Sequence, residues 1–297
     1  MRFPFTGVIP VHKPSGVSSR RVVDAVARVM GMRAVGHAGT LDPLATGVVI
    51  VCIGHATKLV DYVHELPKHY SATFLLGRSS PSDDLETQIE EEESPIQPTH
   101  AAIESAADAF RGQILQRPCD YSAVHVDGRR AYRLARAGRP IAMDSKPVHI
   151  ERLVITGYRW PQLRMEIVCS SGTFVRAIGR DLALALGTRA VMESLVRTAI
   201  GPFSIERCAA LSQIEAGDRD LISAQALLLP ASVAVAHLPQ VSLDSETLIC
   251  AARGGLVPQP NASGHSLAAM DPNGTLVGIL KRHGSGNFRL RPNFLGL

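Results

Sequence analysis

Residues 36–47 read GHAGTLDPLATG, and residues 48–53, VVIVCI, follow them as a short apolar run. The first stretch holds a single acidic residue, Asp42, which is followed by Pro43 and flanked by glycines. Glycine permits positive φ angles or close backbone approach, and a proline biases the residue before it away from helical geometry. The second stretch is β-branched and bounded by glycines, which is typical of a buried strand. The sequence therefore predicts a stiff turn that presents one carboxylate at the edge of a strand.

Two other interpretations of this loop are a phosphate-binding loop and a purely structural turn. A phosphate-binding loop would need Gly-Lys-Ser/Thr or GxGxxG after a strand, and neither pattern is present. An Asp-Pro turn on its own is most often structural. The complete string, however, resembles the catalytic motif of the TruB family of tRNA pseudouridine-55 synthases. The resemblance implies that Asp42 is the catalytic residue, and that His37 helps to fill the space that extruded nucleotides leave.

Two more segments stand in the order that the family shows. KPSGVSS, from Lys13 onward, resembles the Lys-Pro-x-Gly-x-(Ser/Thr)-Ser segment beside the family's active site, which makes Lys13 a candidate substrate-binding residue. Taken alone, the segment is a turn before a predicted helix with Ser19 as N-cap and Gly31 at its end. KHY opens a predicted strand and matches the family's Lys-x-Tyr, which implies that Tyr70 stacks on the target uracil. A strand tyrosine is otherwise usually a core residue, but a flipped base needs an aromatic platform.

An arginine follows apolar residues in the segment GTFVR, which ends at Arg176. This pattern predicts a guanidinium directed toward the interior, where it must be paired. The family's Gly-Thr-(Tyr/Phe)-(Ile/Val)-Arg motif implies that Arg176 contacts Asp42. Further on, LVRT resembles the family's strand at the pocket wall, which makes Thr198 a candidate substrate contact.

The most basic part of the chain is residues 117–146, and residues 82–100 are the most acidic. A helix predicted over 131–137 places arginines along one side with Tyr132 beside them. Such a helix is commonly a solvated face, but the clustering favours contact with RNA. The resemblance implies an insertion over about 121–148 that closes over the T-arm of tRNA. Its candidate RNA-binding residues are Arg129, Arg130, Arg133 and Arg136. The acidic stretch is predicted to be a solvated, partly mobile loop that nucleic acid avoids.

Composition describes an ordinary soluble protein of 297 residues, with 45% hydrophobic residues, 20% charged residues and a net charge of +4. The cysteines are odd in number, dispersed and without ligand spacing, so neither a disulfide scaffold nor a zinc site is expected. They are Cys52, Cys119, Cys169, Cys208 and Cys250. No apolar stretch reaches the length of a membrane span, and we expect a cytoplasmic protein.

By resemblance, the expected fold is α+β, the pseudouridine synthase fold, with a mixed, largely antiparallel central sheet and the basic insertion. Helical patterning over 211–229 precedes short apolar segments that Gly, Pro and Asn separate, which is typical of a small β-barrel. We therefore expect a catalytic domain over residues 1–236 and a PUA-like β domain over residues 237–297.

The expected function is isomerisation of the T-loop uridine of tRNA, with the T-arm recognised largely by shape. The reaction involves neither redox change nor net hydrolysis, so no cofactor and no metal are expected. We expect a monomer whose partner is tRNA. Two alternatives stay open at this point: a guide-RNA-dependent pseudouridine synthase, and a non-catalytic protein that binds or folds tRNA.

Overall fold

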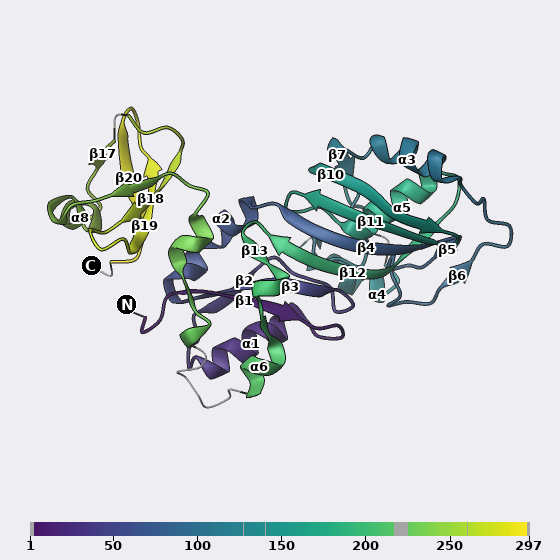
Figure 1. Ribbon diagram of the computed structural model, residues 1–297, viewed down its shortest axis with the longest axis horizontal. Helices are drawn as coiled ribbons and strands as arrows, with labels where there is room; N and C mark the ends of the chain where they lie inside the picture. Colours follow the sequence, from purple (N-terminus) through teal and green to yellow (C-terminus); the bar gives the residue numbers. More distant parts are fainter. Residues whose placement is uncertain (1–2, 127, 140, 217–224, 260, 296–297) are drawn as a thin grey trace.

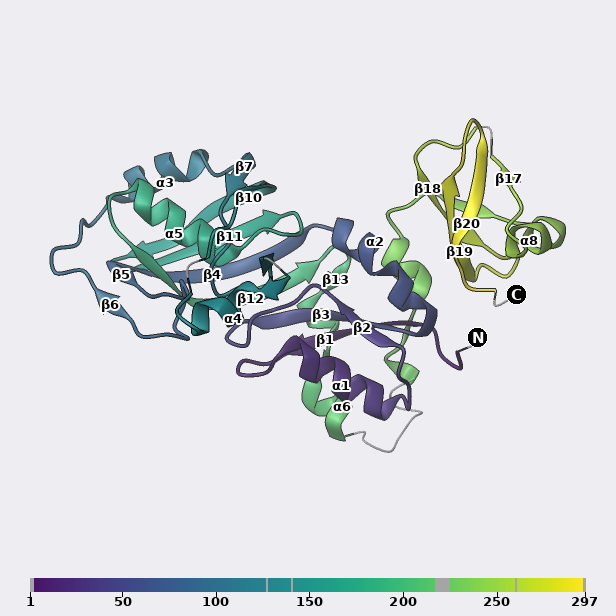
Figure 2. The same ribbon diagram turned by 180° about the vertical axis from the view of Figure 1, so that it is seen from behind.

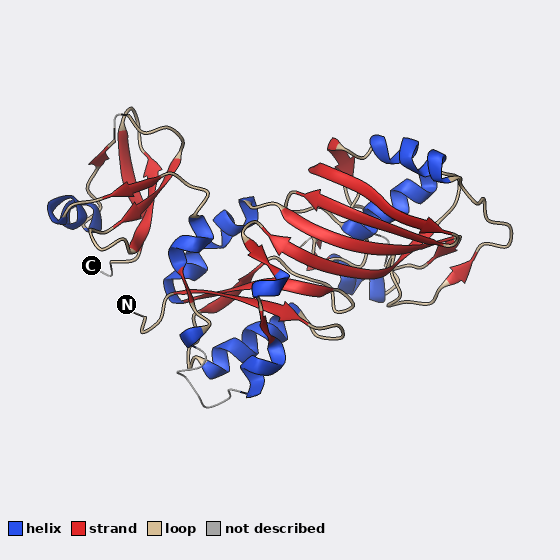
Figure 3. Ribbon diagram, in the orientation of Figure 1, coloured by secondary structure: helices blue, strands red, loops and turns tan. Residues whose placement is uncertain are grey.

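The computed structural model describes residues 3–126, 128–139, 141–216, 225–259 and 261–295. Within these residues a mixed sheet of 11 strands forms the main body, and a sheet of 5 strands follows toward the C-terminus (Figures 1 and 3). The strands of the main sheet are β1 (Gly7–Lys13), β2 (Val35–Ala38), β3 (Thr46–Ile53), β4 (Lys68–Leu76), β7 (Gly112–Gln116), β10 (Lys146–Arg159), β11 (Gln162–Cys169), β12 (Ala190–Ile200), β13 (Phe203–Ser204), β14 (Ala209–Ala210) and β15 (Leu229–Pro230).

The path through the main sheet is β14-β1-β3-β12-β4-β11-β10-β7. Strand β1 pairs parallel with β14, and β3 pairs parallel with β12, whereas the other pairs are antiparallel. The predicted mixed, largely antiparallel sheet is thus confirmed. Strands β3 and β12 are neighbours although β4, β7, β10 and β11 of the same sheet lie between them in the sequence. This pairing brings the loop before β3 against β12.

The described helices include two pairs that pack on the main sheet, while the last of them packs on the C-terminal strands. They are α1 (Ser19–Val29), α2 (Val60–Glu65), α3 (His100–Asp108), α4 (Ala131–Arg136), α5 (Val175–Ala185), α6 (Leu211–Ala216) and α8 (Ser245–Ala252), with short 3-10 turns at Gly54–Leu59, Ile205–Arg207 and Ala231–Val235. Helices α1 and α6 pack together beside β1, and α3 packs with α5 on the other half of the sheet. Figure 2 shows both pairs from behind, and in both views α4 lies below the half of the main sheet that contains β4, β11 and β12.

Helix α1 illustrates how local sequence sets an element. Val22, Val23 and Val26 recur at helical spacing and are all buried. The N-cap is Ser18, whose side chain accepts a hydrogen bond from the backbone N–H of Arg21, so the prediction of Ser19 as N-cap was wrong by one residue. Ser19 is buried instead, and its hydroxyl bonds with the backbone of Leu41 in the loop that carries Asp42.

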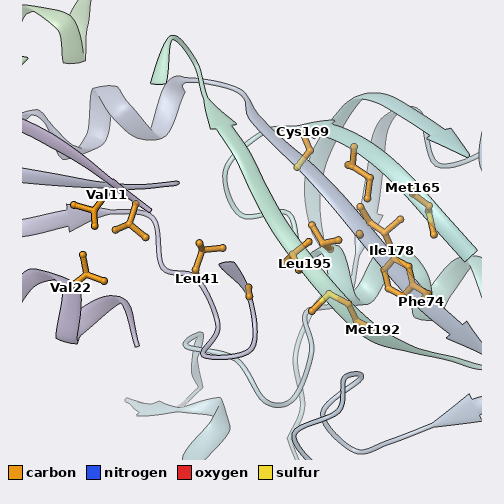
Figure 4. Packing of buried hydrophobic residues seen from close by; sticks show 14 of the residues in the cluster. Val11, Val22, Leu41, Phe74, Met165, Cys169, Ile178, Met192 and Leu195 are labelled. Carbon is orange, nitrogen blue, oxygen red and sulfur yellow. The ribbon is translucent and has the colours of Figure 1, made fainter. Parts of the chain in front are cut away.

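One buried apolar cluster joins the two halves of the main sheet. It runs from Val22 and Val11 through Leu41 to Phe74 and Ile178, as Figure 4 shows. Leu41 therefore anchors the loop that carries Asp42 in the core. On the far side, the ring of Phe74 packs so closely on α5 that a Cβ at Gly179 would lie 2.0 Å from its Cε1. Only glycine fits at that position, and this contact fixes the helix that carries Arg176.

The C-terminal strands form a curled half-barrel with the order β16-β18-β19-β20-β17. They are β16 (Gln240–Ser242), β17 (Val257–Pro258), β18 (Ser266–Met270), β19 (Leu276–Arg282) and β20 (Asn287–Asn293). The half-barrel has its own apolar cluster, which includes Phe288, while Ala268 and Ile279 belong to a cluster shared with the main sheet. The division of the chain at residue 236 stays a prediction.

Two short hairpins complete the described strands: β5 (Arg78–Ser79) with β6 (Glu90–Glu91), and β8 (His125–Val126) with β9 (Arg129–Arg130). The helix expected over 211–229 is observed as α6 up to Ala216, and residues 217–224 lie outside the described part of the chain. Its expected end was wrong, because Leu229 lies in β15. Among the described helices, none has both the length and the apolar character needed to cross a membrane.

Candidate active site

The loop between β2 and β3 presents Asp42 as the sequence predicts. Gly39 and Gly47 have φ angles of 97° and 110°, in the region that favours glycine. A Cβ at Gly47 would lie 2.2 Å from the backbone oxygen of Arg197 on β12, so glycine is required there by close approach as well. Gly36 needs no such freedom, because it lies in β2 and pairs with Cys52. The loop is therefore clamped between two strands.

Arg176, in the first turn of α5, meets the carboxylate of Asp42. Its Nη2 lies 3.0 Å from Asp42 Oδ2, and the side chain of Arg176 is only 4% exposed while that of Asp42 is 37% exposed. The guanidinium also donates to the backbone oxygens of Ser82, at 2.6 Å, and Tyr121, at 2.8 Å. The contact expected from the sequence is present, and Asp42 remains partly open to solvent beside a fixed cation.

A second carboxylate shares this arginine. Asp84 is 1% exposed and its Oδ2 lies 3.4 Å from Nη1 of Arg176. Burial raises the pKa of Asp42, and the charges of Asp84 and Glu86 raise it further, whereas Arg176 opposes them. The pKa of Asp42 is thus raised by burial and by two acidic neighbours and lowered by one arginine.

The acidic stretch was therefore predicted wrongly in its first part. Ser82 and Asp84 are buried rather than solvated, and Asp83 pairs with Arg180 at 3.1 Å. Further along, Glu92 accepts a hydrogen bond from the hydroxyl of Thr188. A run of acidic residues suggests a solvated loop only when its charges have no partners. Here the partners lie on and just after α5, about a hundred residues away in the sequence.

Two adjoining cavities open at Asp42. The smaller, about 420 Å³, is lined by Asp42, Arg176 and Tyr70, and by Leu195 and Arg197 of β12. The larger, about 1050 Å³, is lined by Asp42, by His37 and by residues of the segment 121–139. Asp42 thus lies where a smaller, largely apolar cavity meets a larger one that is lined by several arginines.

Tyr70 and His37 line different cavities. Tyr70, on β4, pairs across the sheet with Arg197, and burial raises the pKa of its hydroxyl. The ring is therefore an uncharged wall of the smaller cavity. His37, in β2, lines the larger cavity, and its buried Nδ1 has no hydrogen-bond partner among the residues that the structure describes. Burial and the nearby Arg197 lower the pKa of His37, so its imidazole is neutral at physiological pH.

Lys13 and Thr198 are not among the described residues that line either cavity. Lys13 is fully buried, and its Nζ donates to the backbone oxygens of Val17, at 2.6 Å, and Pro43, at 3.2 Å. Burial lowers the pKa of Lys13 to about 8. Lys13 therefore holds the Asp42 loop from behind, and Thr198 lies next to the residue that reaches the cavity.

That residue is Arg197, which was not among the site residues predicted from the sequence. It is 2% exposed, and its guanidinium donates to the backbone oxygens of Val48, at 2.7 Å, and Gly39, at 3.0 Å. These bonds tie β12 to both ends of the Asp42 loop. The signal was present, because Arg197 interrupts an apolar strand in the same way that Arg176 follows apolar residues.

The arginines of the basic segment converge on the larger cavity. Arg129 and Arg130 lie in β9, while Arg133 and Arg136 lie on α4, so the expected helix begins after the first two of them. The guanidinium carbons of Arg133 and Arg136 lie 6.0 and 5.6 Å from the ring centroid of Tyr132. Arg20, in the first turn of α1, also lines the cavity. The cavity is suited to a polyanion.

Comparison with solved structures places the fold. An archaeal box H/ACA sRNP Nop10–Cbf5 complex contains a chain that matches 97% of this chain and 86% of its own length, with a TM-score of 0.72 and 22% identity. A Cbf5–Nop10–Gar1 complex matches with a TM-score of 0.74 and 22% identity, over 97% of this chain and 85% of that one. The fold is the pseudouridine synthase fold.

Sequence comparison gives the family. The model described as TruB family pseudouridylate synthase (N terminal domain) matches residues 27–175. The tRNA pseudouridine synthase B of Mycobacterium tuberculosis is 37% identical over 284 residues, which are 94% of this chain and 93% of that protein. The tRNA pseudouridine synthase B of Gloeobacter violaceus is 40% identical over 242 residues, covering 80% and 82% of the two chains. This chain belongs to the TruB family.

Proposed function

We propose that this protein is a tRNA pseudouridine synthase, an isomerase that converts the T-loop uridine at position 55 into pseudouridine. The observation that carries the proposal is the half-exposed carboxylate of Asp42, 3.0 Å from buried Arg176, at the mouth of a small cavity with an aromatic wall. The names of the two TruB relatives support tRNA as the substrate. This chain covers 93% of the Mycobacterium tuberculosis protein and 82% of the Gloeobacter violaceus protein.

The minimum catalytic requirement of this reaction is one ionised carboxylate beside the anomeric carbon of the uridine. The glycosidic bond between N1 and the anomeric carbon breaks, the uracil turns, and C5 forms a bond to the same sugar carbon. The proton on C5 is then lost to solvent and N1 gains a proton, so the product is an isomer of the substrate and no oxidant or reductant is needed. In its ionised form Asp42 either attacks the anomeric carbon or removes a sugar proton. Arg176 favours the ionised form at neutral pH and fixes its direction.

The target nucleotide must leave its stack before Asp42 can reach it. We assign the uracil to the smaller cavity, with Tyr70 as the stacking platform and Arg197 and Leu195 as further walls. His37, neutral and facing the larger cavity, is assigned to the space that the extruded nucleotide leaves. Lys13 and Thr198 are assigned indirect roles, because they support the loop and the strand rather than line the cavities.

The RNA backbone is assigned to the larger cavity. Arg129, Arg130, Arg133 and Arg136 face the space beside Asp42, and guanidinium groups bind phosphate in a bidentate manner. This arrangement suits the T-arm, a structured RNA that is recognised by shape and phosphate contacts. We further propose that the protein acts as a monomer in the cytoplasm, that residues 1–236 form the catalytic domain, and that residues 237–297 form the small C-terminal domain.

A guide-RNA-dependent synthase and a non-catalytic tRNA-binding protein are the alternatives. The test is release of tritium from 5-tritiated uridine in an unmodified tRNA transcript, without guide RNA or cofactor. Wild type should release tritium, Asp42→Asn should be slower by at least about a thousand-fold, and Asp61→Asn, an exposed carboxylate on α2, should match wild type. Tight tRNA binding by wild type without tritium release would refute the proposal in favour of the alternatives.

A further inference from the structure

Glu86 is a carboxylate that the reaction does not use, at the rim of the larger cavity. Its backbone N–H donates to Oδ1 of Asp84 at 2.9 Å, so its place is tied to the buried carboxylate that shares Arg176 with Asp42. Its side chain is 39% exposed and pairs with Nη2 of Arg136 on helix α4. One ion pair thus connects the arginine-bearing insertion to the segment beneath the catalytic centre.

Within the described residues, this ion pair is the one side-chain polar contact between α4 and the protein outside residues 121–148. The other side-chain hydrogen bonds made by α4 and the strand before it stay inside the insertion: Arg130 donates to the backbone oxygen of Ala123, and Arg133 donates to Tyr132. No other ion pair or side-chain hydrogen bond between described residues joins α4 to the protein outside residues 121–148. The pair of Glu86 and Arg136 is therefore the polar contact that holds this helix at the cavity.

In this ion pair, Glu86 occupies a guanidinium that an RNA phosphate would also bind. Arg136 lies among the other arginines of the cavity, where a phosphate would be expected to bind. A carboxylate and a phosphate accept hydrogen bonds from a guanidinium in similar geometry. Two anions on one exposed guanidinium repel each other, and an exposed ion pair is weak enough to exchange. A phosphate that binds Arg136 therefore competes with Glu86 for this arginine.

We propose that Glu86 is an intramolecular substitute for an RNA phosphate, which holds Arg136 and helix α4 at the cavity in the RNA-free protein and yields this arginine to the RNA backbone. Glu86 is a positioning residue, since it touches no reacting atom. The inference rests on the proposed function, because that function makes RNA the ligand of the cavity. Displacement of Glu86 would also remove one of the negative charges that raise the pKa of Asp42.

A double-mutant cycle tests the exchange. The dissociation constant for an unmodified tRNA transcript is measured for wild type, Glu86→Gln, Arg136→Ala and the double variant at one salt concentration. Glu86→Gln should tighten binding about two- to five-fold, the range of an exposed ion pair. The same change in the Arg136→Ala background should leave binding unchanged. Glu93→Gln, an equal charge change at an exposed site in the same acidic stretch, is the control and should have a smaller effect than Glu86→Gln.

If Glu86→Gln tightened binding equally in the wild-type and Arg136→Ala backgrounds, Glu86 would act only as a distant charge. If Glu86→Gln weakened binding, Glu86 would support the RNA-bound form. Either result would overturn the inference. Hydrogen exchange without RNA gives a second test. Amides of residues 131–136 should exchange faster in Glu86→Gln and Arg136→Ala than in wild type, and unchanged exchange would also overturn it. Failure of wild type to release tritium would instead count against the proposed function, which these binding and exchange measurements do not depend on.

Discussion

Arg176 approaches Asp42 from the first turn of α5, with Nη2 3.0 Å from Oδ2, while its other terminal nitrogen lies 3.4 Å from the buried Asp84. One guanidinium thus serves two carboxylates and two backbone oxygens at once. Such a bridge needs the planar fork of arginine, because an ammonium group has only three donors around one point. The geometry of Asp42 therefore depends on the identity of this residue as well as on its charge.

Arg176→Lys tests that dependence. The charge is kept, but the lysine cannot reach both carboxylates and both carbonyl oxygens, so Asp42 should lose its fixed direction. We expect kcat to fall on the order of 100-fold, as a displacement of about 1 Å in a catalytic group commonly causes. Single-turnover tritium release is the measurement, with circular dichroism to verify folding. A variant with wild-type kcat would show that charge alone is sufficient.

The pH dependence of activity should report Asp42. The ionised carboxylate is the active form, and burial together with Asp84 and Glu86 raises its pKa. Activity should therefore be full above this raised pKa and fall as the pH drops through it, at a higher pH than for an ordinary aspartate. Asp84→Asn removes a like charge and leaves Arg176 to Asp42, so the acid limb of kcat/KM should move to lower pH. A limb that moves to higher pH in Asp84→Asn would contradict this account.

Arg133→Ala should weaken tRNA binding and change its response to salt. Each phosphate contact that is lost reduces the slope of log K against log salt concentration by about 0.7 to 0.9. The measurement is a series of dissociation constants across salt concentrations. Arg28→Ala, an exposed arginine at the end of α1 that lines neither cavity, is the control and should keep the wild-type slope. An Arg133→Ala slope equal to that of wild type would remove α4 from the RNA interface.

Gly179→Ala should destabilise the fold through the helix that carries Arg176. The added Cβ would meet the ring of Phe74 at 2.0 Å, so α5 or β4 must shift. Overpacking of this kind costs about 1–3 kcal/mol, which chemical denaturation would detect. Phe74→Leu in the same chain should restore part of the loss by making room. If Gly179→Ala unfolded at the wild-type denaturant concentration, close packing would not be what fixes α5.

The sequence was most informative where neighbours in the chain decide the structure. Pro43 restricts the backbone at Asp42, whereas Gly39 and Gly47 permit the positive φ angles that the turn needs, and both effects act within a few residues. The apolar repeat of α1 likewise predicts its buried face, although the N-cap is Ser18 rather than Ser19. Arg176 could be expected to need a buried anion, and the resemblance to a family with several separate motifs supplied Asp42 as that anion.

The tertiary structure decided how distant charges meet. Asp84 belongs to a stretch whose local composition predicts a solvated loop. Helix α5, however, brings Arg176 and Arg180 against this stretch, and their ion pairs offset the desolvation cost of burying its carboxylates. Arg197 reaches the Asp42 loop because β12 pairs parallel with β3, and the contact of Glu86 with Arg136 depends on where the insertion lies. By itself the sequence determined the carboxylate, its stiff loop and the family. Only the fold decided which charges surround that carboxylate, because electrostatic interaction depends on distance in space and not on separation along the chain.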